Sequence, residues 1–510
     1  MARKKTKTKV RRDAKPEQAV ESGQVLDLKS AAAFLKVSKP TFYRWLAQGK
    51  IKGFKAGQQW RFYRRDLEQF LQAEEPSALL ADAEKLRQAV ERGRKARGLR
   101  AADWTPIEDQ SPEESAVIRA VNIIVADALE ARASDIHMDN GPDETLVRYR
   151  IDGVLQEAMR LPREASRPMV ARLKLLGDMN ISERRAPQYG RISIKHQGKD
   201  YDLRVTTLPA MFGESAIARI LDQSSVLIGV DRLGFSEQMR KALERVLHYS
   251  PTGLVVVTGP AGCGKTTTLY SILHQINSPE RKIVSIEDPV EYCLPNTMQV
   301  HVNRKAGLTM AVALRAFVRA DPDIILVGAV QDLETAEQCV QAALTGHLVL
   351  TAMLPGDAPS VVTRLIDMGL DPFLISGCLA AVLAQRLVRR VCQKCKAKHT
   401  PSESVLQRLG EQTGLDLARA KFACGKGCEE CRGTGYRGRA GIYELMEVDE
   451  KLRELIARPA STSELREAAT EGGMTTMLRD GIEKAAQGIT TIPEVLRVLA
   501  GHQKQAQLKE

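Results

Sequence analysis

The chain has 510 residues, of which 43% are hydrophobic and 27% charged, and its formal net charge is +12. This length provides for two to four domains, and the composition is that of globular rather than disordered or fibrous proteins. The longest apolar stretch, residues 373–384, is shorter than the about 20 residues that cross a bilayer, and the basic N-terminus lacks the apolar core of a signal peptide. We therefore expect a cytoplasmic protein without a transmembrane segment.

Residues 1–24 are predicted to form a basic, disordered tail. The first 15 residues contain eight lysines and arginines and one acid. Such a run is typically solvated, but it can also bind nucleic acid or anionic lipid through charge alone. The sequence leaves both functions of the tail open.

Residues 25–72 have the pattern of a small separate domain. Ser38 is a good N-cap for a helix that has Pro40 in its first turn and ends at Gly49. Residues 54–62 then predict a β-hairpin, and residues 66–71 a further helix. The segment resembles the excisionase-type helix-turn-helix domain, and the chain is therefore expected to begin with a winged helix-turn-helix.

This resemblance implies binding of duplex DNA. In that family the second helix enters the major groove and the hairpin wing contacts the backbone. The residues that match the reading helix are Lys39, Thr41, Tyr43 and Arg44, and those that match the phosphate contacts are Lys55, Arg61, Arg64 and Arg65. The alternative is a packing or protein-binding domain that keeps the fold without binding DNA. Residues 73–114, which follow, predict a charged linker with a helical middle.

Residues 259–266, Gly-Pro-Ala-Gly-Cys-Gly-Lys-Thr, form a phosphate-binding loop motif. An apolar run precedes the loop and a predicted helix follows it, which is the context that the motif requires. Lys265 is expected to reach the β- and γ-phosphates of ATP, and the Thr266 hydroxyl to hold Mg²⁺. The expected nucleotide contacts are Gly259, Pro260, Ala261, Gly262, Cys263, Gly264, Lys265, Thr266 and Thr267.

Short apolar strands are predicted at residues 283–286, 323–327 and 348–351, and they alternate with helices. This alternation indicates a parallel sheet that binds ligands at the carboxyl edge of its strands. The first of these strands runs directly into the acidic pair Glu287 and Asp288.

Four of the nine cysteines form two Cys-x-x-Cys pairs: Cys392 with Cys395, and Cys428 with Cys431. This spacing is that of tetrahedral zinc sites, and four thiolates leave no open coordination position. We therefore expect a structural Zn²⁺. Cys424 is a spare thiol that can take the place of Cys428, so this ligand stays open.

From residue 116 to residue 500 the chain resembles the type II secretion and type IV pilus assembly ATPase family. The matching stretches include ASDIHMD at residues 133–139, VRYRIDGVL at 147–155, the acidic box VSIEDPVEY at 284–292, and TGHLVL at 345–350. The resemblance implies a multidomain α/β fold. Its parts are an α+β N-terminal motor half (115–230), a RecA-like core with a parallel sheet (231–390), a tetracysteine zinc element (391–440) and a C-terminal helical region (441–510).

The resemblance also implies the groups that act on the nucleotide. They are the acids and the histidine Glu287, Glu291 and His347, together with the arginines Arg191, Arg204, Arg315 and Arg319. Two positions depart from the family. Its Walker B strand is followed by Gly-Glu, whereas this chain has Gly328 and Ala329, and its second histidine is replaced by Leu354. A methyl group neither orients nor deprotonates water, so we expect weak or absent hydrolysis.

Two functions follow. One is an ATP-binding protein with little hydrolysis, joined to a DNA- or partner-binding domain. The other is a hexameric assembly motor at the inner membrane that works with platform proteins and uses Glu287 in place of the missing glutamate. The residue chemistry favours the first function, and neither the DNA site nor the machinery served follows from the sequence.

Overall fold

The computed structural model describes residues 25–28, 30–31, 46, 53–56, 59–64, 66, 88–89, 92, 116–222, 229–249, 252–458 and 460–500. The chain divides into two compact units, Met1–Arg87 and Gln88–Glu510. The predicted tail, most of the predicted linker and residues 501–510 lie outside the described residues.

The first unit contains a three-stranded sheet of order β1-β3-β2. Its strands are β1 (Val25–Asp27), β2 (Phe54–Ala56) and β3 (Gln59–Tyr63). β2 and β3 pair antiparallel where the sequence predicts the hairpin. Arg61 and Arg64 lie within the described part of this unit. The other predicted DNA contacts, Lys39, Thr41, Tyr43, Arg44, Arg65 and the side chain of Lys55, lie outside it.

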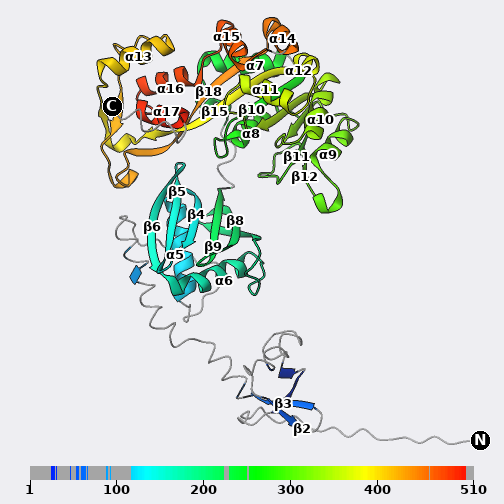
Figure 1. Ribbon diagram of the computed structural model, residues 1–510, viewed down its shortest axis with the longest axis vertical. Coiled ribbons are helices and arrows are strands. Elements are labelled where there is room, and N and C mark those ends of the chain that lie inside the picture. The colour runs from blue at the N-terminus through cyan, green and yellow to red at the C-terminus, as the bar shows by residue number, and fades with distance from the viewer. Residues whose placement is uncertain are drawn as a thin grey trace, which may run out of the picture. The chain divides into compact units, whose positions relative to one another are not determined.

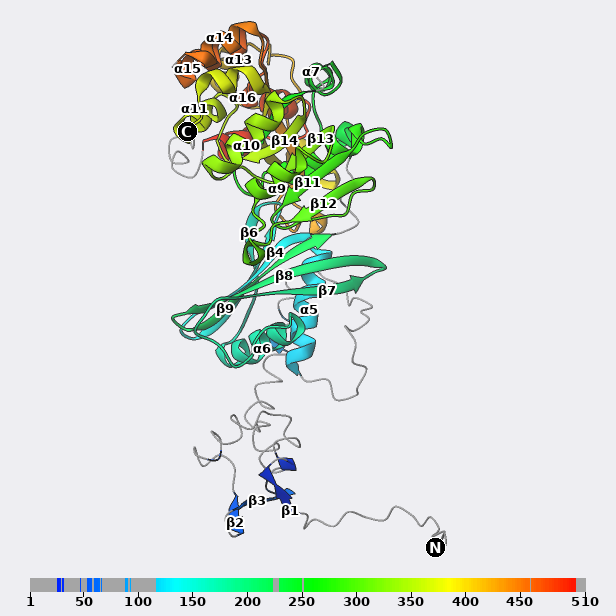
Figure 2. The same ribbon diagram turned by 90° about the vertical axis from the view of Figure 1, so that its right-hand side faces the viewer.

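The N-terminal half of the second unit is an antiparallel sheet with two helices (Figures 1 and 2). The six strands have the order β6-β5-β4-β9-β8-β7. The elements are α5 (Ala116–Glu130), β4 (Ala133–Asn140), β5 (Glu144–Ile151), β6 (Val154–Pro162), α6 (Ser166–Leu176), β7 (Gln188–His196), β8 (Lys199–Ala210) and β9 (Gly213–Asp222). Alternating burial along β4 and β5 shows that the helices cover one face of this sheet.

The core of the second unit is a seven-stranded sheet of order β12-β11-β13-β14-β10-β15-β18. Its first six strands pair parallel, and β18 joins antiparallel at the edge, so the sheet is mixed rather than purely parallel. The strands before the tetracysteine element are β10 (Gly253–Thr258), β11 (Ile283–Glu287), β12 (Thr297–His301), β13 (Ile324–Val327), β14 (Leu348–Met353) and β15 (Leu379–Val391).

Helices cover both faces of this sheet (Figure 1). They are α7 (Glu237–Tyr249), α8 (Lys265–Ile276), α9 (Met310–Phe317), α10 (Leu333–Leu344), α11 (Pro359–Asp367) and α12 (Pro372–Cys378). β10, β13 and β14 are buried at every position because both faces are covered. This explains why these strands are apolar without alternation.

The C-terminal part inserts a small element between two paired strands. β15 and β18 (Tyr436–Glu447) pair along most of their length. β18 thus crosses the expected boundary at residue 440 and belongs to the core sheet. The remaining elements are β16 (Lys396–Lys398), α13 (Glu403–Thr413), β17 (Ala423–Gly425), α14 (Glu450–Ala457), α15 (Thr462–Glu471), α16 (Met477–Ala486) and α17 (Ile492–Leu499). Among the described helices, none has both the length and the apolar character of a membrane span.

Candidate functional site

The loop between β10 and α8 has the backbone of a phosphate loop. Gly262 and Gly264 adopt positive φ values of 75° and 92°, a region that glycine enters without strain. A Cβ at Gly259 would lie 2.5 Å from the carbonyl oxygen of Gln385 and 2.7 Å from the sulfur of Cys263. The tertiary structure therefore requires glycine at the start of this loop.

Lys265, the first residue of α8, folds back over the loop. Its Nζ donates to the carbonyl oxygens of Gly259, at 2.7 Å, and Pro260, at 3.0 Å. Burial lowers the pKa of Lys265. Phosphate oxygens are stronger acceptors for an ammonium group than neutral carbonyls are, so this arrangement is suited to an anionic ligand.

Gln385 of β15 holds this loop through hydrogen bonds, a role that no sequence motif predicted. Its Nε2 donates to the carbonyl oxygen of Cys263 at 2.8 Å, and its Oε1 accepts from the Thr268 hydroxyl at 2.8 Å. The side chain is buried. Gln385 lies far downstream in the chain and reaches the loop only because β15 pairs with β10.

A cavity of about 540 Å³ opens at the carboxyl edge of the sheet, beside the loop. Its lining includes Thr266, Glu287, Glu291 and Ala329. The structure thus brings together the predicted magnesium ligand, both predicted acids and the position of the missing glutamate.

Glu287 is buried at the end of β11 and held at both oxygens. Oε2 accepts from the Tyr270 hydroxyl at 2.6 Å, and Oε1 from the Ser285 hydroxyl at 2.8 Å. Burial raises the pKa of Tyr270, and the hydrogen bond to Glu287 raises it further. Tyr270 therefore stays a donor, and Glu287 is fixed in position.

Three arginines form a row across the antiparallel sheet. Arg191 of β7 pairs with Arg204 of β8, and Arg204 pairs with Arg219 of β9. Burial raises the pKa of Glu291, whereas Arg204 and Arg219 oppose that rise through their charges. Because Glu291 lines the cavity, the charges of Arg204 and Arg219 act on the acidic side of that cavity. The sequence interpretation missed Arg219, although it lies within a stretch that matches the family.

The other predicted arginines lie around α9. Arg315 forms an ion pair with Glu334 at 2.9 Å, and Glu334 also lines the cavity. Arg319 is exposed just after that helix. In the antiparallel sheet, Arg191 of β7 forms an ion pair with Asp202 of β8. These contacts are compatible with surface roles as well as with roles at the nucleotide.

The two histidine-box positions lie at opposite ends of β14. His347 precedes β14, and its Nδ1 lies 2.9 Å from the carbonyl oxygen of Ala342. Leu354 follows β14, is 64% exposed and does not line the cavity. A strand of six residues spans about 20 Å, so the structure does not bring His347 to the phosphate loop.

The four predicted cysteine ligands meet in one cluster. The sulfurs of Cys392, Cys395, Cys428 and Cys431 all lie within 4.8 Å of one another. The Cys392–Cys428 and Cys395–Cys431 sulfur distances are both 3.8 Å. Tetrahedral ligation with zinc–sulfur bonds of about 2.3 Å requires sulfurs about 3.8 Å apart. These four side chains fit Zn²⁺, and the structure selects Cys428 over Cys424 as the fourth member.

The chain matches two family models. Residues 110–497 match the model described as "Type II/IV secretion system protein", and residues 25–75 match the model described as "Helix-turn-helix domain". The "Type II secretion system protein E" of Pseudomonas aeruginosa is 42% identical over 408 residues, which cover 78% of this chain and 80% of that protein. The "Type IV pilus assembly ATPase PilB" of Thermus thermophilus is 44% identical over 384 residues, which cover 75% of this chain but only 43% of that protein.

Solved structures share the fold. The Legionella pneumophila ATPase DotB has a TM-score of 0.54 at 18% identity, over 77% of this chain and 98% of that one. The Yersinia pseudotuberculosis ATPase DotB has a TM-score of 0.55 at 16% identity, over 78% of this chain and 96% of that one. At this identity the likeness concerns the architecture of the second unit alone.

Proposed function

The chain belongs to the Type II/IV secretion system protein family, and from this membership we propose that it binds MgATP while hydrolysing it weakly or not at all. One observation carries the proposal. Ala329 lines the same cavity as Thr266, at the position where the family resemblance expects a glutamate. The geometry of the phosphate loop supports nucleotide binding. The methyl group of Ala329 stands in place of the carboxylate that would orient the attacking water.

The remaining groups do not replace that glutamate. Lys265 and the arginines supply positive charge, which stabilises phosphate oxygens but accepts no proton from water. Glu287 already accepts hydrogen bonds from Tyr270 and Ser285. We assign Glu287 a structural role, in which it keeps the acidic side of the cavity in place.

A second candidate function is an active motor in which Glu287 acts as the base. Its support is that Glu287 lines the same cavity as Thr266. A steady-state ATPase assay on purified full-length protein separates the two. The first function requires nucleotide binding with turnover well below about 1 s⁻¹, and the second requires turnover at or above about that rate.

In either case we propose a cytoplasmic homo-hexamer that associates peripherally with the inner membrane and works with secretion or pilus platform proteins. The support is family membership, since the relatives are named for type II secretion and type IV pilus assembly. Exposed apolar side chains on both halves, among them Tyr189, Met211 and Phe373, are suited to subunit contacts.

We expect one structural Zn²⁺ per chain, bound by the four clustered thiolates. The Cys428→Ser variant should lose the metal because the tetrahedral set is then incomplete. The matched Cys424→Ser variant should keep it, since Cys424 lies outside the cluster. Elemental analysis of protein purified without chelator measures both. A wild type without zinc, or loss of zinc only in the Cys424 variant, would contradict the assignment.

We further propose that the helix-turn-helix unit binds duplex DNA. The Arg61→Ala/Arg64→Ala variant should shift less DNA than wild type at low salt, and wild-type binding should fall steeply as salt rises because phosphate contacts release counterions. The exposed pair Lys195 and Lys199 of the second unit, changed to alanine, provides the control. Absence of any DNA shift by the full-length protein at low salt would assign the unit to packing or protein binding instead.

A further inference from the structure

The N-terminal half of the second unit has a basic pocket of about 530 Å³ that shares no residue with the nucleotide cavity. Arg163, Arg167 and Arg184 surround it, and Val170 and Phe212 are among its apolar lining. We propose that this three-arginine pocket binds the acidic segment of residues 101–115 of the same chain.

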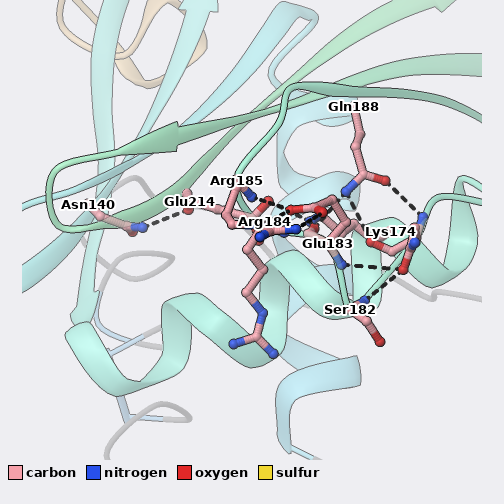
Figure 3. Close-up of polar contacts among 9 residues, drawn as sticks. Asn140, Lys174, Ser182, Glu183, Arg184, Arg185, Gln188 and Glu214 are labelled. Carbon is pink, nitrogen blue, oxygen red and sulfur yellow. Dashed lines mark hydrogen bonds and ion pairs between the residues drawn. The ribbon is translucent and has the colours of Figure 1, made fainter. Parts of the chain in front are cut away.

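The loop that carries Arg184 is fixed by a buried lysine (Figure 3). The Nζ of Lys174 donates to the carbonyl oxygen of Glu183 at 2.6 Å and forms an ion pair with the carboxylate of Glu214. Gln188 Nε2 donates to the same carbonyl oxygen at 2.8 Å. Lys174 is 1% exposed, so this anchor is shielded from solvent. The loop therefore presents Arg184 from a defined position.

Asn140 fixes the side of the pocket that Ser166 and Glu214 line. Its Nδ2 donates to the carbonyl oxygen of Glu214 at 2.7 Å, and its Oδ1 accepts from the Ser166 hydroxyl at 2.6 Å. These bonds join the end of β4, the start of α6 and the start of β9. Three elements that are distant in sequence thus form one pocket wall.

The arginines of the pocket have donor groups available for an anionic ligand. Arg163 donates to the carbonyl oxygen of Pro142 at 2.7 Å. Within the described part of the chain, the guanidinium groups of Arg167 and Arg184 have no hydrogen bond or ion pair, and Figure 3 shows Arg184 extending away from the contacts of its loop. Among the described residues, two acids also line the pocket, but Lys174 neutralises Glu214, so Glu164 alone of these two opposes the three arginines. The pocket is therefore net positive.

Residues 101–115 have the complementary chemistry. They contain five acids, Asp103, Glu108, Asp109, Glu113 and Glu114, and no lysine or arginine. They also contain Trp104 and Ile107. Carboxylates can pair with the guanidinium groups of Arg167 and Arg184, while an aromatic or aliphatic side chain can contact the apolar lining.

The described start of α5, to which this segment is attached, lies toward the pocket end of the sheet. α5 begins at Ala116, directly after the segment. Val121 of α5 lines a small cavity together with Met138, two residues before Asn140, and with Leu173 of α6. Fifteen extended residues span up to about 50 Å, which is ample reach for the pocket.

Because the segment is covalently attached, weak contacts are sufficient for it to bind the pocket. An exposed ion pair contributes little on its own. A ligand on a short tether, however, has an effective concentration in the millimolar range, so a few such pairs populate the bound state. Binding in the pocket would anchor the linker between the two units and make its attachment sensitive to salt.

The test is site-specific crosslinking in the full-length protein. A benzophenone amino acid at Trp104 should, on illumination, crosslink to the pocket, including Phe212, as identified by mass spectrometry. The Arg167→Glu/Arg184→Glu variant should lower that yield on the order of tenfold, because tethered binding here depends on charge. Neither guanidinium group has a hydrogen bond or ion pair with another described residue, so this variant should fold.

Two controls make the test specific. The Lys195→Glu/Lys199→Glu variant carries the same change of charge where β7 ends and β8 begins, away from the pocket, and its yield should equal that of wild type. Adding Glu113→Arg/Glu114→Arg to the arginine variant should restore the yield by exchanging the charges. Crosslinks that avoid the pocket, or equal losses in the arginine and lysine variants, would overturn the proposal. Crosslinks only between isotope-labelled and unlabelled copies would assign the pocket to a second copy and overturn it too.

Discussion

Replacing Ala329 with glutamate and Leu354 with histidine is expected to raise steady-state ATP hydrolysis on the order of a thousandfold, because the two polar groups that the family resemblance expects are restored. Ala329→Glu alone should supply most of the gain, since Ala329 lines the cavity beside Thr266 whereas Leu354 does not. Phosphate release measures the rate. The matched variant Ala329→Gln has nearly the same size but accepts no proton, so it should remain slow while binding nucleotide normally.

Wild-type turnover at about 1 s⁻¹ or faster would contradict the loss of hydrolysis. Glu287 would then be the base, and Glu287→Gln should silence the enzyme. If wild type is slow and Ala329→Glu binds ATP without any gain in rate, the defect lies elsewhere in the site and the role given to Ala329 is wrong.

The Lys265→Ala variant is expected to lose detectable ATP binding, a weakening of about a hundredfold or more, because a charge-assisted contact to the phosphates disappears. Fluorescence of a labelled ATP analogue measures the affinity. Cys263→Ser is the matched control within the loop. It keeps the backbone donors and Lys265, so it should bind like wild type. Equal binding by wild type and Lys265→Ala would place the nucleotide elsewhere.

Sequence alone determined the features that depend on neighbouring residues. The phosphate loop was predictable because its glycines, its lysine and the flanking strand and helix are contiguous, and Gly262 and Gly264 supply the positive φ values that the loop uses. The β2–β3 hairpin and the two Cys-x-x-Cys pairs follow for the same reason. The absence of glutamate at Ala329 is likewise visible in the sequence, because a motif fixes where that glutamate would stand.

Tertiary structure decided what depends on residues brought together from distant parts of the chain. Gln385 reaches the phosphate loop through strand pairing, and Cys428 rather than Cys424 completes the cysteine cluster. Register placed Arg219 beside Arg204. The pairing of β14 with β10 places His347 at the edge of the sheet opposite the phosphate loop. Sheet order, register and loop closure arise from long-range packing, whose energies are distributed over many side chains, so no local motif encodes them.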